Sequence, residues 1–567
     1  MSNYLISEQN NSIFIINNRK NYLFCICDTY EVLIWDSLSF IFEINYEEHN
    51  YEPVPSPTTR AVAKGIVLFY DSLINIIVTK MLTLLLIVPL IGSLLLLPIT
   101  EDSVASKTKM RQIALAASLI NLIISIVLWI QFDSSTSQYQ FVTNIAAELG
   151  SSSLTINIGV DSLSIYFVLL TTFITPICIL SNWEDINVNF KYFLISFLVL
   201  ETLQIGLFVS LDLLVFYIFF ESVLIPLFLI IGIWGSGLAR VRASFMLFLY
   251  TLFGSLWMLL AIVVIAYNYG STDLQFIQWA GEISLESQKW LWLAFFISFA
   301  FKTPLFPVHI WLGWAHTSAP LGGSIILAAV ILKLATYGFL RILIPIFPDA
   351  THFYSPLVQT LAVITLVYAS LATLRQTDLK GIVALSSVCH MAVVILGLFS
   401  NTLVGIEGSI LLSIAHGFVS PALFLCVGGI LYHRFHTRTI NYYRGIALTM
   451  PIFTIMFFLF TLFNMGVPLS LNFVGEFLSL SGIFQRSPII GVLGSTGIFF
   501  SACYSIWMYN RISYGSYSKY LPVTNDVSRR EFMLLLTLLI PTLALGVFPN
   551  TILNTLHLSV TALLYQV

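Results

Sequence analysis

Residues 213–232 read LLVFYIFFESVLIPLFLIIG, an apolar run of twenty residues whose only charge is Glu221. A run of this length crosses the hydrocarbon core of a bilayer as an α-helix. Similar runs recur along the chain, which predicts an all-α polytopic membrane protein with about fourteen transmembrane helices. The other expected spans are 82–99, 112–131, 163–181, 192–209, 243–267, 290–314, 321–344, 356–374, 381–400, 408–432, 450–475, 488–510 and 532–549.

The overall composition supports a membrane location and excludes several classes of function. Of the 567 residues, 58% are hydrophobic and only 9% are charged, against about 25% charged residues in soluble domains. The net charge of −3 gives no basic surface for nucleic acid. The six cysteines are scattered, and no glycine fingerprint for nucleotides occurs. We therefore expect a lipid bilayer around the chain, and no nucleotide, flavin or metal site on it.

The two ends of the chain differ from the apolar middle. Residues 1–80 carry eight acidic residues between Glu8 and Glu52, whereas a mitochondrial transit peptide is rich in arginine and poor in acids. We therefore expect 1–80 to be an N-terminal extension that is not a typical targeting peptide. Residues 81–550 form the expected transmembrane domain, and 551–567 is expected to be an amphipathic C-terminal tail at the membrane surface.

The distribution of basic residues predicts the orientation of the helices. With fourteen spans, one set of alternate loops holds fifteen Lys and Arg residues and the other set holds two, Lys289 and Arg486. The positive-inside rule places the first set on the cytoplasmic or matrix side, so both ends of the transmembrane domain face the opposite side. Arg341 ends a span on the basic-poor side, where we expect it to snorkel into water. The fifteen are Lys107, Lys109, Arg111, Lys191, Arg240, Arg242, Arg375, Lys380, Arg434, Arg438, Arg444, Arg511, Lys519, Arg529 and Arg530.

Charged residues inside the expected spans are the main functional signal. Glu221, Lys302 and Lys333 lie within spans, Glu476 directly follows one, and Glu201 lies inside the fourth. A charge at the bilayer centre costs about 2.5–3.5 kcal/mol on insertion scales, and such residues usually mark ion pathways. The alternative is a set of structural ion pairs that only hold helices together. Because five such charges recur, the sequence favours transport.

Two of these spans are interrupted by proline. Pro304 and Pro307 follow Lys302, and Pro468 precedes Glu476; proline breaks a helix, and broken helices in corresponding halves point to a transport site. The offset from residue 221 to residue 390 is 169, and that from 302 to 476 is 174. These similar offsets predict two five-helix repeats, spans 4–8 and 9–13, each with one broken helix. Five crossings per repeat make the second copy inverted.

Three histidines inside the spans extend the series of titratable groups. His390 and His416 lie between Lys333 and Glu476 in the sequence, and imidazole both donates and accepts protons near neutral pH. We therefore expect His390 and His416 to relay protons. His309 follows the broken seventh span, where it either joins the relay or caps the helix that follows.

These residues lie in motifs that resemble the antiporter-like family of complex I and Mrp complexes, in its mitochondrial, fungal form. The resemblance covers nearly all of 82–550. The motifs are FFESVLIP (219–226), AFKTPLFPVHIWL (300–312), AHTSAP (315–320), VILKLATYG (330–338), ALSSVCHM (384–391) and NFVGE (472–476).

The resemblance implies a role for each site residue. Glu221 would pair with Lys302 and tune its proton affinity, and Lys333 would join two half-channels. His390 and His416 would continue a hydrophilic axis to Glu476, which would pass the proton onward. Paralogous pump subunits of the family typically carry lysine where this chain has Glu476.

The function implied is that of a proton-translocating membrane-arm subunit of respiratory complex I, in the mitochondrial inner membrane. NADH, FMN, iron–sulfur clusters and ubiquinone would be bound by other subunits, and the neighbours would include paralogous antiporter-like chains of the membrane arm. The alternatives are an Mrp-type cation/proton antiporter subunit and a purely structural membrane scaffold.

Overall fold

The computed structural model describes residues 4–9, 12–17, 23–25, 80–101, 103–144, 156–184, 186, 188–279 and 283–565. The chain divides into two compact units at residues 73 and 74. The first contains an antiparallel sheet of β1 (Tyr4–Gln9), β2 (Ser12–Asn17) and β3 (Leu23–Cys25) in that order. Most of the predicted 1–80 extension lies outside the described residues.

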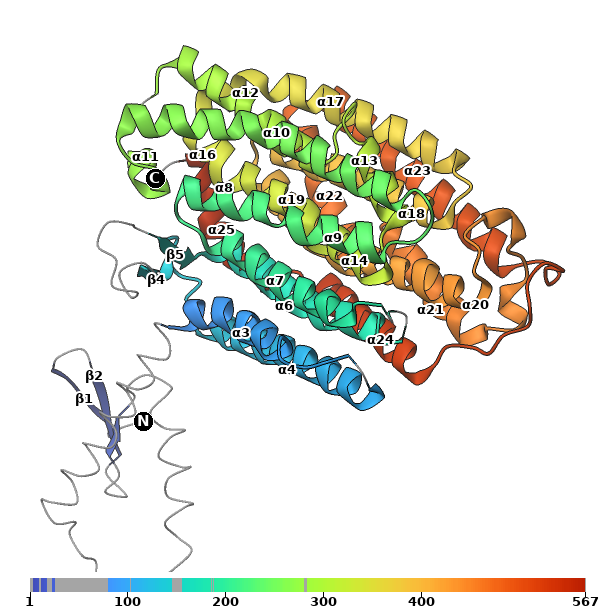
Figure 1. Cartoon of the computed structure of the whole chain (residues 1–567). Coiled ribbons are helices and arrows are strands. Elements are labelled where there is room, and N and C mark those ends of the chain that lie inside the picture. The colour runs from blue at the N-terminus through green and yellow to red at the C-terminus, as the bar shows by residue number, and fades with distance from the viewer. Residues whose placement is uncertain are drawn as a thin grey trace, which may run out of the picture. The chain divides into compact units, whose positions relative to one another are not determined.

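The second unit is helical, as expected, and its long helices lie side by side (Figure 1). Within the described residues, the helices other than α11 and α25 form fourteen segments that correspond one for one to the expected spans. In chain order they are α3 (Met81–Leu96), α4 (Val104–Gln131), α6 (Ser162–Ser181), α7 (Phe190–Val209), α8 with α9 (Leu213–Ser222, Leu224–Trp234), α10 (Arg240–Tyr269), α12 with α13 (Leu285–Lys302, Ile310–Ser318), α14 to α16 (Leu321–Ile326, Leu332–Gly338, Ile344–Ile346), α17 (Pro348–Arg375), α18 (Leu379–Leu398), α19 with α20 (Leu403–Phe424, Tyr432–Phe435), α21 with α22 (Pro451–Asn464, Leu471–Arg486), α23 (Pro488–Ser513) and α24 (Arg529–Val547).

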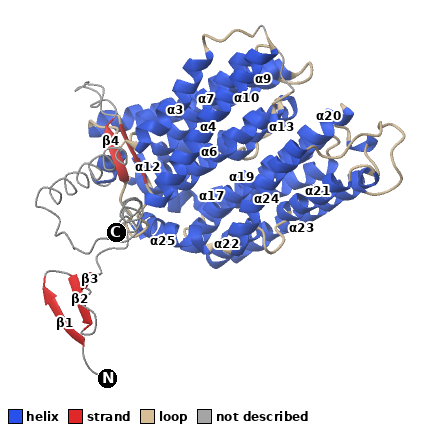
Figure 2. Ribbon diagram, turned by 90° about the horizontal axis from the view of Figure 1, so that it is seen from below, coloured by secondary structure: helices blue, strands red, loops and turns tan. Residues whose placement is uncertain are grey.

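The lengths of these segments fit a membrane. Eleven helices of the described residues are long and apolar enough to cross one, and α3 and α21 are shorter apolar helices. The predicted all-α polytopic membrane architecture is therefore confirmed. Figure 2 shows the few non-helical elements, among them the hairpin strand β4 (Gln140–Asn144), which pairs antiparallel with β5 (Asn157–Val160). The short helix α11 (Leu274–Trp279) precedes α12, and α25 (Asn550–Tyr565) ends the chain.

Breaks occur where the sequence predicts them and at one further place. The expected breaks separate α12 from α13 and α21 from α22. The further break divides the fifth segment at Val223, between α8 and α9. Pro226 explains its position, because a proline lacks an N–H and its ring clashes with the carbonyl four residues earlier, here that of Ser222.

Three segments of wider π-helical turns lie inside the central helices. Two flank α15, at Leu327–Ile331 (η2) and Phe339–Leu343 (η3), and the third follows α19 at Leu425–Leu431 (η4). Such turns occur mainly as single bulges and frequently at functional sites. Here they lie in the two segments that the rest of the unit surrounds most completely.

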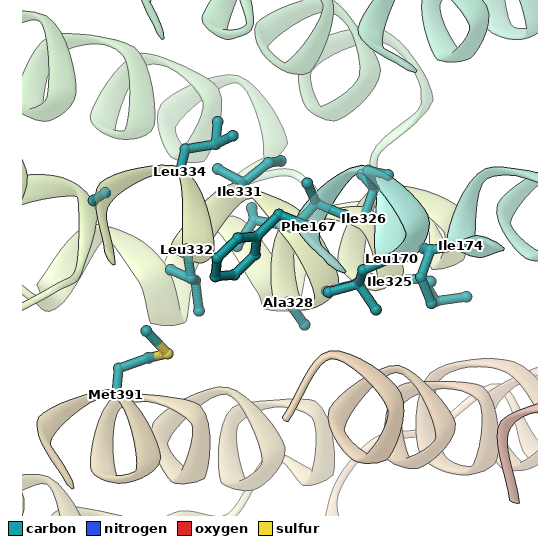
Figure 3. Packing of buried hydrophobic residues seen from close by; sticks show 14 of the residues in the cluster. Phe167, Leu170, Ile174, Ile325, Ile326, Ala328, Ile331, Leu332, Leu334 and Met391 are labelled. Atoms are coloured by element: carbon teal, nitrogen blue, oxygen red, sulfur yellow. The ribbon is translucent and has the colours of Figure 1, made fainter. Parts of the chain in front are cut away.

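The core lies around these two segments. The apolar stretches of Leu321–Ile346 and of Leu403–Phe435 are fully buried within the protein, whereas only a third or less of Val104–Gln131 and of Arg529–Val547 is buried. Figure 3 shows Phe167 and Leu170 of α6 packed beside Ile325, Ile331 and their neighbours, with Met391 of α18 close by. The central segments thus touch protein on all sides, and the outer ones present an apolar surface suited to lipid.

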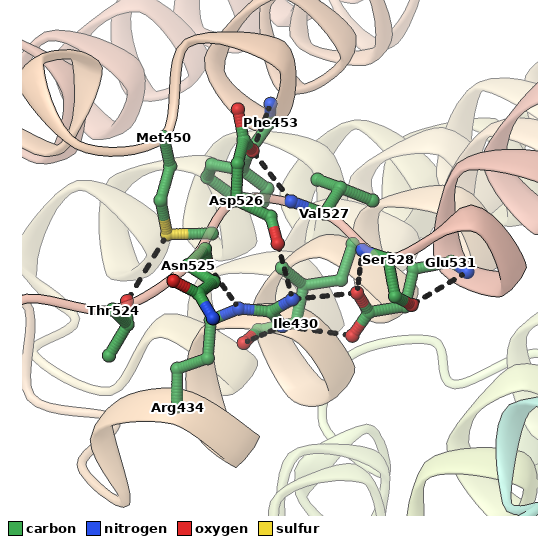
Figure 4. Close-up of polar contacts among 10 residues, drawn as sticks. All are labelled: Ile430, Arg434, Met450, Phe453, Thr524, Asn525, Asp526, Val527, Ser528 and Glu531. Atoms are coloured by element: carbon green, nitrogen blue, oxygen red, sulfur yellow. Dashed lines mark hydrogen bonds and ion pairs between the residues drawn. The ribbon is translucent and has the colours of Figure 1, made fainter.

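A polar cluster lies at the end of the helical unit that carries Arg240, Arg375, Arg434 and Arg529. This end is called here the basic end. The guanidinium of Arg434, on α20, donates to both carboxylate oxygens of Glu531, at 2.8 and 2.7 Å (Figure 4). It also donates to the carbonyls of Asn525 and Asp526. Ser528 caps α24 through a capping box with Glu531. This cluster holds the loop before α24 against α20.

Two basic residues are not where the sequence analysis placed them. Arg341 does not snorkel into water: it lies in η3, is buried, and pairs with Asp161 at 2.5 Å. Lys380 is not a loop residue, because it is the second residue of α18 and is only 4% exposed. Both are placed by partners that are distant in the sequence, which a count of charges along the chain does not detect.

Candidate functional site

Lys302 is the last residue of α12, directly before the first predicted break, and it is fully buried. Its ammonium donates to the main-chain carbonyl of Phe220 at 2.7 Å and lies 3.4 Å from the centroid of the Phe220 ring. A carbonyl and an aromatic face both stabilise a cation. The break in the fifth segment thus lies beside the carbonyl that holds the lysine.

Glu221 follows Phe220 on α8 and is only partly buried. It interacts electrostatically with Lys302, but no Glu221 oxygen lies within ion-pair distance of the ammonium among the ion pairs of the described residues. Its Oε1 is buried and has no hydrogen-bond partner within the described chain. The implied direct ion pair is therefore absent: the two charges are neighbours, and Phe220 makes the contact.

Lys333 and His416 form a direct contact at the centre of the core. Lys333, on α15, has its ammonium 2.7 Å from Nδ1 of His416, on α19, and also donates to the carbonyl of Ala328 in η2 at 2.5 Å. Both side chains are buried. An ammonium donating to Nδ1 leaves the imidazole proton on Nε2, so one proton can move between lysine and histidine along an existing hydrogen bond.

His390 and Glu476 form a second direct contact between buried titratable side chains, in this case between α18 and α22. Nδ1 of His390, on α18, lies 2.9 Å from a carboxylate oxygen of Glu476, on α22. Its Nε2 lies 3.1 Å from Oδ1 of Asn464, at the end of α21. Both ring nitrogens face oxygen acceptors, so the ring can carry a proton on each. The ring centroids of His390 and His416 are 5.7 Å apart, which completes a series from Lys333 to Glu476.

The two predicted repeats bring equivalent segments together, although the groups in contact differ. In the first half, the second segment (α8) meets the broken fourth (α12) through Phe220 and Lys302. In the second half, the second segment (α18) meets the broken fourth (α22) through His390 and Glu476. The similar offsets in the sequence thus correspond to similar pairs of segments in space, joined through a main-chain carbonyl in the first half and through two side chains in the second.

The two further candidate residues lie apart from this series. Glu201, on α7, is fully buried and accepts a hydrogen bond from Asn121 of α4 at 2.8 Å. His309 is the N-cap residue of α13, but its side chain makes no capping hydrogen bond; the ring lies 5.7 Å from that of Tyr368. Capping therefore does not explain His309, and neither residue contacts the series from Lys333 to Glu476.

Two buried residues that the sequence analysis did not select lie between the basic end and Lys333. His316, in α13, is fully buried and stacks on Phe424 at 4.5 Å between centroids. Lys380, in α18, donates to the carbonyl of Ala319 at 2.8 Å. In the sequence, His316 was noted only as part of the motif AHTSAP. A histidine within an apolar segment is itself an indication of a functional residue, and this indication could have identified it.

Glu476 also lines a cavity of about 590 Å³ between α22 and α23. Its walls are mainly apolar, with Phe473, Phe477 and Phe484 among them, and Ser481 and Gln485 follow Glu476 along α22.

The arrangement as a whole can hold protons at several buried nitrogen and carboxylate atoms and transfer them over short distances.

Comparisons with known proteins identify the family of the chain. The family model described as "NADH:quinone oxidoreductase/Mrp antiporter, TM" matches residues 210–501, which contain Glu221, Lys302, Lys333, His390, His416 and Glu476. NADH-ubiquinone oxidoreductase chain 4 of Mycosarcoma maydis is 64% identical over 86% of this chain and 100% of the relative.

Solved structures show the same fold. A chain of respiratory complex I from Thermus thermophilus, solved with bound NADH, has a TM-score of 0.75 at 29% identity and covers 86% of this chain and 99% of its own. A chain of the Mrp complex from Dietzia has a TM-score of 0.74 at 18% identity, covering 86% and 98%, and shows the fold alone. The resemblance expected from the motifs is confirmed, and this chain belongs to the transmembrane NADH:quinone oxidoreductase/Mrp antiporter family, beside relatives named NADH-ubiquinone oxidoreductase chain 4.

Proposed function

We propose that this chain translocates protons in the membrane arm of respiratory complex I. The observation that carries the proposal is the series of buried contacts from Lys333 through His416 and His390 to Glu476. Lys302 precedes the series in the first half of the molecule. Buried titratable groups within a membrane usually face a wet cavity or a bundle interior and mark ion pathways, and the relatives named chain 4 favour complex I over an Mrp antiporter.

The chain acts as a subunit of NADH:ubiquinone reductase and carries no redox chemistry itself. NADH, FMN, the iron–sulfur clusters and ubiquinone belong to partner subunits, and the neighbours in the membrane arm include paralogous antiporter-like chains. Translocation is driven by conformational or electrostatic changes that reach this chain from its neighbours. Moving one charge against 100 mV requires about 2.3 kcal/mol.

The location and orientation follow from the same proposal. The chain lies in the mitochondrial inner membrane, with the basic end in the matrix and the two ends of the transmembrane domain toward the intermembrane space. The support for this orientation is the excess of basic residues at one end of the molecule, since such residues stay on the matrix side. Protons then move from the matrix end past Lys333 and leave by way of Glu476.

Substitutions of Lys302 test the proposed function against a structural scaffold. Lys302→Met removes the proton carrier, and Lys302→Arg keeps the positive charge but cannot release a proton, because guanidinium stays protonated in proteins. We expect both variants to assemble and both to lose the proton flux of this subunit, measured as the proton-to-electron ratio in proteoliposomes. NADH–ubiquinone turnover should fall as well.

The matched control is Lys289→Met, which removes a lysine from the opposite end of the same helix, α12, where it lies over the ring of Phe353. This variant should keep both the proton-to-electron ratio and the turnover. An assembled complex with Lys302→Arg and a normal ratio would contradict the carrier role and leave Lys302 as a packing residue.

A further inference from the structure

Asn464 is a buried amide in contact with the proposed relay, and the proposed pathway gives it no role. It is the last residue of α21, at the start of the break before α22, and it is only 3% exposed. Its Oδ1 lies 3.1 Å from Nε2 of His390, and its Nδ2 donates to the hydroxyl of Ser505, on α23, at 3.2 Å. One side chain therefore joins α21 to both α18 and α23.

The two contacts of Asn464 fix the orientation of its amide. An amide nitrogen donates hydrogen bonds, whereas an amide oxygen only accepts them. Because Nδ2 faces Ser505, the atom that faces His390 is Oδ1. The hydrogen bond made by one ring nitrogen of a histidine decides where the ring is protonated. Nε2 of His390 must then carry a hydrogen, which is held between the ring and Asn464.

The other ring nitrogen of His390 is directed at Glu476. Nδ1 lies 2.9 Å from Oε1 of Glu476. The second carboxylate oxygen, Oε2, lies so close to Gly466 that a Cβ there would overlap it, and Gly466 has a φ of +71°. Glycine adopts this conformation without strain and leaves room for the oxygen. The break between α21 and α22 thus supplies both the acceptor for Nε2 and the space for Glu476.

The position of the hydrogen on the ring decides whether His390 can protonate Glu476. A neutral ring whose single hydrogen is on Nδ1 cannot release it, because a buried imidazolate anion would remain, and burying an unpaired charge is costly. A ring with hydrogens on both nitrogens can do so. The Nδ1–H bond breaks, an O–H bond forms on Glu476, and the neutral Nε2–H ring remains. One proton moves and no electrons are exchanged.

We propose that Asn464 is a positioning residue that keeps a hydrogen on Nε2 of His390, so that His390 exchanges protons with Glu476 through Nδ1 alone. Ser505 orients the amide of Asn464. The inference rests on the proposed function and deepens it, because it names the atom at which the relay works. The structural alternative is that Asn464 only bridges three helices.

Replacing Asn464 with leucine tests this role. Asn464→Leu keeps a side chain of similar size but removes the acceptor, which leaves a buried N–H of His390 unsatisfied. The doubly protonated ring should become roughly 5- to 150-fold rarer, which corresponds to about 1–3 kcal/mol. We expect NADH–ubiquinone turnover of the assembled complex to fall. The ratio of turnover in H2O to turnover in D2O should rise above that of wild type, because proton transfer at His390 then limits the cycle.

A milder variant on α23 has a matched control. Ser505→Ala leaves Asn464 in place but frees its amide to rotate. Ser501 lies one turn earlier on α23, is also buried, and donates to the carbonyl of Ile498 in its own helix. Ser505→Ala should lower turnover less than Asn464→Leu does and should still raise the solvent isotope effect, whereas Ser501→Ala should change neither. If Asn464→Leu does not assemble, the comparison of the two serine variants decides.

The outcomes separate positioning from bridging, and both from the proposed function. Lower turnover of Asn464→Leu or Ser505→Ala with an unchanged solvent isotope effect would show a structural bridge and overturn the proposal. If Lys302→Arg abolishes pumping while both of these variants turn over normally, the positioning role is wrong and the function stands. If Lys302→Arg also pumps normally, the function is wrong and the inference falls with it.

Discussion

Replacing Arg341 with methionine should destabilise the helical unit strongly, because the residue holds three distant elements together. Its Nε donates to the Tyr337 hydroxyl at 2.9 Å, one terminal nitrogen to the Tyr139 hydroxyl at 2.9 Å, and the other to the Asp161 carboxylate at 2.5 Å. Tyr139 precedes β4, Asp161 caps α6, and Tyr337 lies in α15. Three side chains from distant parts of the sequence are thus held by one guanidinium.

The size of the effect follows from burial. Arg341 and Asp161 are 7% and 3% exposed, and removing one partner of a buried ion pair costs about 3–5 kcal/mol because an uncompensated charge remains. Arg341→Lys keeps the charge but loses the fork geometry, and one charged hydrogen bond is worth about 1.5–3 kcal/mol. In the double variant Arg341→Met/Asp161→Asn, the unpaired carboxylate charge of residue 161 is removed, while the asparagine side chain still accepts the N-cap hydrogen bond. The double variant should therefore be more stable than Arg341→Met alone.

The assay is the thermal midpoint of the purified complex, followed by intrinsic fluorescence and by release of this subunit on native gels. The expected order of stability is wild type, then Arg341→Lys, then Arg341→Met, with the double variant above Arg341→Met. An unchanged midpoint for Arg341→Met, or a double variant less stable than Arg341→Met, would refute the reasoning that burial of this pair dominates.

Three further outcomes are expected. Glu476→Gln should leave the complex assembled but remove this subunit's pumping, and His390→Asn should do the same, as measured by the proton-to-electron ratio; normal ratios would remove both residues from the relay. In intact mitoplasts labelled from outside, a cysteine at the exposed position Trp279 should react and one at Leu238 should not, and the reverse pattern would invert the orientation. A chain that begins at Met81 should still pump once assembled, because the composition of the extension matches neither a span nor a proton path; lost pumping in an assembled complex would contradict this.

The number and order of membrane segments were predictable from the sequence because hydropathy is a local property. Each run of about twenty apolar residues corresponds to a helical segment, and proline marks the two expected breaks. The offsets between charged residues also indicated which segments are equivalent, since α18 meets α22 at His390 and Glu476 as α8 meets α12 at Phe220 and Lys302.

The contacts of individual charges were not predictable in the same way. Lys302 donates to the main-chain carbonyl of Phe220. Every residue has such a carbonyl, so the sequence does not indicate which one accepts, although Pro226 indicates the nearby break between α8 and α9. Arg341 and Lys380 stand at the ends of apolar runs, where hydropathy cannot distinguish a side chain in water from one that faces a partner 180 or 61 residues away. Only the packing of distant segments decides between the two.

The complete enclosure of the two central segments has a consequence for the surrounding lipid. Bilayer thickness acts on a protein through mismatch at its lipid-facing helices, which tilt to adapt. In the described structure α4 and α24 face outward, while the segments carrying Lys333 and His416 each contain an apolar stretch of 18 residues that is completely buried within the protein. A change in acyl-chain length should therefore tilt the outer helices and leave the spacing of Lys333 and His416 unchanged, so that membranes of different thickness can host the same relay.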